Sequence, residues 1–213
     1  MIRKLLKHII VPSGYAFHIK GRDDVIKIHI TKTAGTSLSK ALRFNTPNNK
    51  KGFKKHHFAR EVIDLIGQDK WSSAIRFSFV RNPWDRMYSY YRFKKRKGKV
   101  VNDIEKDSFS AWLKNMLPSM EGKPYHKARP QTEWLIDHDG NIDYHFIGRF
   151  EKMEEEIKRL SELLETPINL PVINRSYPII HYSSAYNDET IALVEEHYRS
   201  DIKMFNYSFE LKK

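Results

Sequence analysis

The sequence predicts an α/β fold, in which helices cover both faces of a parallel sheet and residues 1–213 form a single domain. Three strand–helix units lead to this prediction. They join strands at 25–30, 75–80 and 144–147 to helices at 36–44, 83–97 and 151–164. β-Branched and apolar residues fill the strands, and apolar residues recur at helical spacing in the helices. Strands that alternate with helices in this way are typical of a parallel sheet.

The other predicted elements lie before, between and after these units. Ser108 is a good N-cap for a helix that ends near Leu117, with Trp112, Leu113 and Met116 on its inner face. Further elements are a hairpin arm at 15–20 with a turn at 21–23, helices at 60–66, 132–136 and 187–205, and loops at 45–55 and 120–130. No internal repeat or low-complexity tract divides the chain.

Composition favours a folded domain, because 40% of the residues are hydrophobic and 13% are aromatic. No stretch has the ~20 uncharged apolar residues that a membrane-spanning helix needs. We expect the basic and apolar segment 1–12 to cover an edge of the sheet. Contact with a membrane surface is the alternative for this segment.

The absence of cysteine excludes disulfides, thiolate metal sites and a cysteine nucleophile. The sequence also contains no convincing metal-binding motif. The pairs His56–His57 and His138–His145 do not have the sequence context of known zinc sites. We therefore expect chemistry without a metal ion.

Lys32 is the first candidate site residue. It lies where a predicted strand turns into a helix, in the run His29-Ile30-Thr31-Lys32-Thr33-Ala34-Gly35-Thr36-Ser37. A cation among backbone N–H groups at a helix start is a pocket for a phosphate or sulfate. The ATP-type loop Gly-x-x-x-x-Gly-Lys-Ser/Thr is absent, since Lys32 precedes the only glycine of the run. An ordinary turn that contains a lysine is the alternative.

A second anion-binding motif follows the strand at 75–80. Asn82 is a good N-cap and Pro83 suits the first helical position, which leaves Arg81 at the end of the strand. Ser89 then lies about two turns into the helix. An arginine fork and a helix hydroxyl can together hold a dianionic phosphate. The alternative is an Arg81 paired with a carboxylate and a Ser89 that faces solvent.

At these positions the chain resembles the sulfotransferases that use 3'-phosphoadenosine 5'-phosphosulfate (PAPS), in particular the sulfotransferase 2 family of carbohydrate sulfotransferases. Their 5'-phosphosulfate loop, His-Ile-Pro-Lys-Thr-Ala/Gly-Gly-Thr-Ser, matches His29 to Ser37 except that Thr31 replaces the usual proline. The segments 146–151 and 186–207 are also similar, so the resemblance runs from about residue 27 to 207. It implies a three-layer fold like that of P-loop nucleoside triphosphate hydrolases.

The resemblance also implies roles for individual residues. Lys32 would neutralise charge on the leaving phosphate, and Arg81 and Ser89 would hold the 3'-phosphate. His56 aligns with the proposed catalytic base of the family, with His57 as a close second and exposed loop histidines as the alternative. His29 is expected to be structural. Backbone N–H groups of the loop would bind the 5'-phosphate, and these belong to Thr33, Ala34, Gly35, Thr36 and Ser37. Arg129, Gln131, Arg149 and the segment 174–176 are weaker candidates for either substrate.

PAPS is thus the expected sulfate donor, without a metal, and a hydroxyl of a carbohydrate is the expected acceptor. The formal net charge of +12, concentrated at Lys50–Arg60 and Arg92–Lys99, suits an anionic donor and an anionic glycan. Vertebrate Golgi members of the family carry an N-terminal anchor that is not found here. We therefore expect a soluble cytoplasmic enzyme of a microbe or virus, with peripheral membrane contact left open.

Two other functions remain open. A nucleotide-dependent kinase would use a similar strand–loop–helix unit, but the position of Lys32 and the Arg81–Ser89 pair disfavour it. A non-catalytic module that binds nucleic acid or another polyanion would suit the net charge of +12 and the tyrosines at 88, 90 and 91. Such a module would show no preference for a 3'-phosphorylated adenosine, and we expect no nucleic-acid partner.

Overall fold

The computed structural model describes residues 18–19, 22–42, 56–98, 108–120, 127–170 and 180–211. The described part contains a four-stranded sheet in the order β1–β2–β3–β4. Its strands are β1 (His18–Ile19), β2 (Arg22–Ile28), β3 (Ile75–Val80) and β4 (Phe146–Arg149). β2, β3 and β4 run parallel, as predicted, whereas the short hairpin strand β1 is antiparallel to β2 and makes the sheet mixed.

Helices follow the strands in the predicted alternation. The helices are α1 (Gly35–Ala41), α2 (Ala59–Ile66), α3 (Gln68–Ser73), α4 (Pro83–Arg96), α5 (Phe109–Met116), α6 (Gln131–Leu135), α7 (Met153–Leu163), α8 (Asp188–His197) and α9 (Arg199–Phe205). Two predicted caps are confirmed: the side chain of Asn82 accepts a hydrogen bond from the Trp84 N–H at 3.1 Å, and that of Ser108 accepts one from the Ala111 N–H at 3.1 Å.

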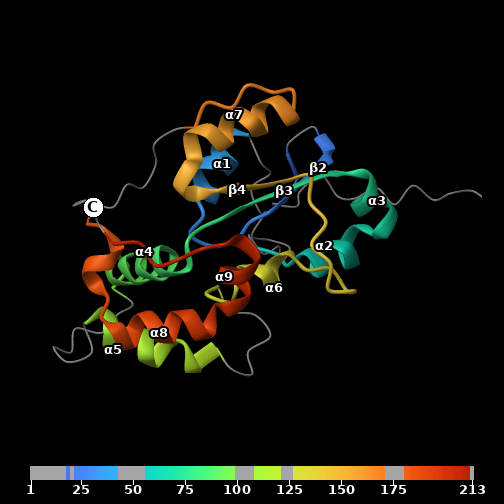
Figure 1. The fold of residues 1–213 in the computed structure, drawn as a ribbon. Coiled ribbons are helices and arrows are strands. Elements are labelled where there is room, and N and C mark those ends of the chain that lie inside the picture. Colours follow the sequence, from blue (N-terminus) through green and yellow to red (C-terminus); the bar gives the residue numbers. More distant parts are fainter. Residues whose placement is uncertain are drawn as a thin grey trace, which may run out of the picture.

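Apolar side chains cover both faces of the sheet. Phe77 and Phe79 of β3 pack with Leu38 of α1 and Leu160 of α7 on one face. Alternate residues of β2, such as Ile28, point to the opposite face, where they pack against α2, α3, α6 and α9. Figure 1 shows α1 and α7 on one side of the sheet, with α4, α5 and α8 on the other.

A third apolar cluster joins α4, α5 and α8. It contains Met87 of α4, Leu113 and Met116 of α5, and Val194 of α8, and Trp112 packs against it. The predicted inner face of α5 is therefore confirmed. Tyr90 and Tyr91 of α4 are buried in the same cluster, so these two rings do not form an exposed stacking surface for nucleic-acid bases.

Several predicted boundaries were wrong. The helix predicted at 36–44 ends at Ala41, and the strand predicted at 144–147 begins at Phe146, because the strand pairing with β3 starts at Phe146. Gly67 ends α2 as expected, but α3 follows it at once. The helix predicted at 187–205 is broken at Tyr198, whose buried hydroxyl donates a hydrogen bond to the Ala128 carbonyl.

Candidate functional site

The carboxyl ends of β2 and β3 lead into the two predicted anion-binding motifs. Because parallel strands end at the same edge of a sheet, the loop at 31–34 and Arg81 meet there. The Nη1 group of Arg81 donates a hydrogen bond to the backbone carbonyl of Lys32 at 3.0 Å. The two motifs, far apart in sequence, are thus in direct contact.

The loop itself has an unusual backbone. Lys32 and Ala34 have positive φ angles of 70° and 60°, and the Thr33 hydroxyl donates to the Ile30 carbonyl at 2.9 Å. Gly35 has no room for a side chain, since an added Cβ would lie 1.8 Å from Nε2 of His29. His29 is buried beneath the loop, which agrees with the structural role expected for it.

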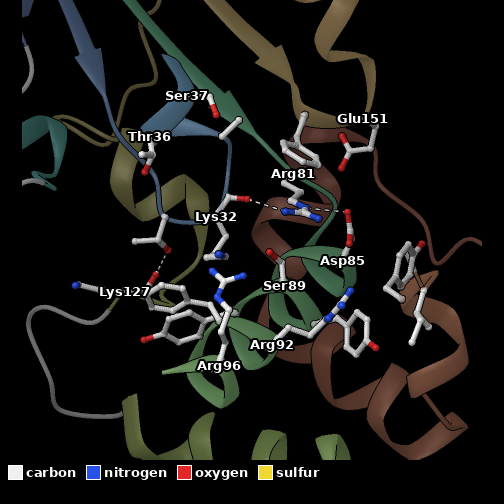
Figure 2. A pocket seen from close by; sticks show the side chains of 18 of the residues that line it. Lys32, Thr36, Ser37, Arg81, Asp85, Ser89, Arg92, Arg96, Lys127 and Glu151 are labelled. Carbon is white, nitrogen blue, oxygen red and sulfur yellow. Dashed lines mark hydrogen bonds and ion pairs between the residues drawn. The ribbon is translucent and has the colours of Figure 1, made fainter. Parts of the chain in front are cut away.

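A cavity of about 860 Å³ opens over this loop. Figure 2 shows Lys32 and Arg81 facing it from the sheet edge, while Ser89, Arg92 and Arg96 face it from α4. Further lining residues come from later segments of the chain: Lys127, Phe150, Glu151, Ile180, His181, Tyr182 and Glu210. Segments from most of the length of the described chain therefore line the cavity, and many of the lining side chains are cationic.

The ammonium group of Lys32 is partly buried in this cavity. Its Nζ lies 4.7 Å from the centre of the Phe93 ring. Burial, reinforced by the charges of Arg81 and Arg96, lowers the pKa of Lys32 to about 8. A lysine in such a place gains from an anionic ligand, because the ligand compensates for lost water and for the repulsion of its cationic neighbours.

The guanidinium of Arg81 is held on several sides. Its Nε group pairs with Asp85 at 2.7 Å, and its plane centre lies 3.9 Å from the centre of the Phe150 ring. The buried side chain of Gln131 bonds both the N–H and the C=O of Arg81, at 2.9 and 2.8 Å. Arg81 is thus paired with a carboxylate, as in the alternative interpretation of the sequence, and it also lines the cavity.

The two candidate histidines have different surroundings. His56 lines the cavity, and its Nδ1 lies 2.9 Å from the carbonyl of His29. His57 is buried, lies 3.7 Å from a carboxylate oxygen of Glu61, and is not among the residues that line the cavity. His56 therefore lines the same cavity as Lys32, whereas His57 does not.

A family model described as "Sulfotransferase family" matches residues 15–208, which is most of the chain. The chain belongs to the sulfotransferase 2 family. No curated protein and no solved structure gives a significant match. Family membership indicates sulfuryl transfer as the general activity.

Some of the remaining candidate residues of this sulfotransferase line the cavity, and others do not. Ala34, Thr36 and Ser37 line the cavity, while Thr33 and Gly35 are buried in the loop. Arg129 pairs with Glu133, and Gln131 holds the backbone of Arg81. Arg149 bonds the Phe205 carbonyl. The segment 174–176, the loop 45–55 and the loop residues 99–107 lie outside the described residues.

Sequence reasoning missed several residues that shape the site of the sulfotransferase. Arg86 and Asp201 are both fully buried, and Tyr182, Glu151 and Glu210 line the cavity. Buried ionic groups have no local sequence signal, because their partners come from distant segments. Glu151 and Asp201 lie in the segments 146–151 and 186–207 that resemble the family, but the resemblance names no role for them, and Tyr182 and Glu210 lie outside both segments.

The described ranges also bear on metal binding and on membrane insertion. Within these ranges, no group of three or more His, Asp or Glu side chains could hold a metal ion. Nor does any helix of the described part have the length and apolar character needed to cross a membrane.

Proposed function

We propose that this sulfotransferase transfers a sulfuryl group from PAPS to a hydroxyl group of a carbohydrate. The observation that carries the proposal is the meeting of Lys32, Arg81 and Ser89 around one cavity of about 860 Å³. A bound PAPS would supply the activated sulfuryl group. The cationic lining suits a ligand with phosphates at two positions, since Arg and Lys donors form strong charge-assisted hydrogen bonds to phosphate.

In this proposal the two motifs bind the two ends of the donor. Lys32 and the backbone of the loop that ends at Ser37 hold the 5'-phosphosulfate, and Arg81 and Ser89 hold the 3'-phosphate. Asp85 and the Lys32 carbonyl already orient the Arg81 guanidinium, so little ordering is needed when the ligand binds. The strand–loop–helix unit at this edge also supports a fold related to the P-loop nucleotide-binding proteins.

The chemistry requires one proton acceptor and one cation. The acceptor oxygen forms a bond to sulfur while the bond between sulfur and the bridging oxygen breaks. Lys32 stabilises the negative charge that develops on the departing phosphate. His56 receives the proton of the acceptor hydroxyl. Because the His29 carbonyl can only accept a hydrogen bond, Nδ1 of His56 carries the hydrogen, and Nε2 is the nitrogen that takes the proton.

Transfer from radiolabelled PAPS to desulfated heparin, chondroitin and dextran tests this assignment. We expect His56→Ala to lower kcat by about 10²–10⁴-fold, the usual contribution of a general base, with affinity for the desulfated product PAP nearly unchanged. His138→Ala is the matched control, because His138 is an exposed histidine paired with Asp64 and lies outside the cavity lining. Full activity of His56→Ala would show that His56 is not the base.

A further inference from the structure

Arg86 is a buried cation that the proposed chemistry does not use. It has no solvent exposure, and it lies on α4 between Asp85 and Ser89. In the part of the chain that the structure describes, no carboxylate forms an ion pair with it. Its guanidinium is directed instead at oxygen atoms of two chain segments outside α4.

The first of these segments is the loop at 31–34, called the phosphate loop below because it holds the 5'-phosphosulfate in the proposed function. Nε of Arg86 donates to the Thr31 carbonyl at 3.1 Å, and Nη2 lies 3.4 Å from the Thr31 hydroxyl. The residue that follows is Lys32, with its positive φ of 70°. Arg86 therefore holds the peptide from which the strained turn of the loop begins.

The second segment is the turn at 127–130, which precedes α6. Nη1 and Nη2 of Arg86 donate to the carbonyls of Arg129 and Lys127, at 3.0 and 3.1 Å. The Thr31 hydroxyl also donates to the Lys127 carbonyl. The Arg86 guanidinium thus bonds both the phosphate loop and this turn. The hydrogen bond from the Thr31 hydroxyl to Lys127 links the two segments directly.

Residues near the C-terminus, Tyr198 and Asp201, hold the turn at 127–130 and the start of α6 in place. The Tyr198 hydroxyl donates to the Ala128 carbonyl at 2.6 Å. The buried Asp201 carboxylate accepts from the N–H groups of Gln131 and Thr132 at 2.7 and 2.8 Å. Since the Gln131 side chain holds the backbone of Arg81, the turn connects both anion-binding motifs. These contacts also explain why the last helix breaks at Tyr198.

We propose that Arg86 is a positioning residue: acting through Thr31, it fixes the conformation of the phosphate loop relative to Arg81. The inference rests on the proposed function for its effect on catalysis, but the loop conformation can be measured without a donor. Only the planar fork of an arginine can serve these oxygens together, and a lysine ammonium at the same position would not span both segments.

The test compares two conservative substitutions of buried threonines. Thr31→Val removes the hydroxyl that bonds Lys127 and leaves the Thr31 carbonyl in place. Thr190→Val is the matched control: Thr190 is buried, its hydroxyl caps α8 through Asn187, and it is not among the residues that line the cavity. Both variants should lose stability by a similar amount, because each loses the hydrogen bonds of one buried hydroxyl. Arg86→Lys is the second, stronger perturbation.

Two readouts separate the possible outcomes. In hydrogen exchange of the ligand-free protein, we expect amides 32–37 to exchange about tenfold faster in Thr31→Val and faster still in Arg86→Lys, but unchanged in Thr190→Val. We expect the affinity for PAP to fall about tenfold in Thr31→Val and further in Arg86→Lys, but to stay unchanged in Thr190→Val. Unchanged loop exchange in both Thr31→Val and Arg86→Lys would overturn the inference. Failure of the unsubstituted protein to bind PAP would refute the proposed function instead.

Discussion

The pKa of Lys32 is lowered to about 8 by burial and by two neighbouring guanidinium groups. An exposed lysine keeps its charge up to about pH 10. Lys32 therefore begins to lose its charge just above neutral pH while the cavity contains no anion. A phosphate bound beside it would favour the protonated form and raise this pKa again.

This property predicts a pH dependence of donor binding. Below pH 8 Lys32 is protonated and attracts phosphate, and above pH 8 it becomes neutral in the free protein. The affinity for PAP should therefore fall as pH rises, by about tenfold between pH 7 and pH 9. Titration calorimetry in buffers of different ionisation enthalpy should also show proton uptake near pH 8. Lys32→Met should bind more weakly, with a flat profile; an equal slope in that variant would contradict the assignment.

The sequence identified some residues of the site and missed others. Lys32, Arg81 and Ser89 stood out because each has a fixed offset from a strand end. The choice between His56 and His57 depended on which side of the chain faces the cavity, and the spacing of the two residues does not determine that. Arg86 gave no signal, because its oxygen partners belong to Thr31 and to the turn at 127–130.

At the scale of elements, the phosphate loop depends on one close contact between Gly35 and His29. The His29 ring occupies the space where a side chain at position 35 would lie, with its Nε2 at 1.8 Å from the Cβ position. The ring also lies 4.3 Å, centre to centre, from the ring of His56. Gly35, His29 and His56 therefore form one packed unit under the start of α1.

Substitution at Gly35 tests this unit. Elsewhere at a helix start, glycine to alanine is neutral or slightly stabilising. Here Gly35→Ala should lower stability by about 1–3 kcal/mol, as overpacking does, and weaken PAP binding. The double variant His29→Ala with Gly35→Ala should recover most of the stability lost by Gly35→Ala alone. Thermal unfolding would measure both effects. Additive losses in the double variant would show that the two residues do not compete for the same space.

Most strands and helices could be predicted because their signals are local. The strand at 75–80 and the start of α4 at Pro83 follow from composition and capping. The breaks could not be predicted in this way. α3 packs Trp71 into the core beneath the sheet, and the last helix breaks where Tyr198 and Asp201 reach the turn before α6. Both features depend on contacts between distant parts of the chain.

At the scale of the whole molecule, the parallel edge of the sheet brings distant segments together. The loop after β2, helix α4, the turn before α6 and the residues around Tyr182 all contribute to one cavity. Parallel order was predictable from the alternation of strands and helices. The contribution of 180–182 and Glu210 was not, since loop positions are set by packing that leaves no periodic pattern.

The net charge of +12 has a general and a specific consequence. A positive surface attracts any polyanion at low salt, and this attraction weakens as salt screens it. The proposed function is more specific, because in it Arg81 and Ser89 hold a phosphate at the 3' position of an adenosine. Discrimination between adenosine phosphates, rather than affinity alone, therefore separates a sulfotransferase site from general polyanion binding.

The most direct test is calorimetric titration with PAP and with ADP, which lacks the 3'-phosphate, at two salt concentrations. We expect PAP to bind at least about tenfold more tightly than ADP, or ~1.4 kcal/mol, at both concentrations. Arg81→Ala should remove this preference, whereas Arg159→Ala, which breaks the ion pair with Glu156 on α7, should keep it. Equal binding of PAP and ADP, falling together as salt rises, would contradict the 3'-phosphate site and favour a general polyanion-binding protein.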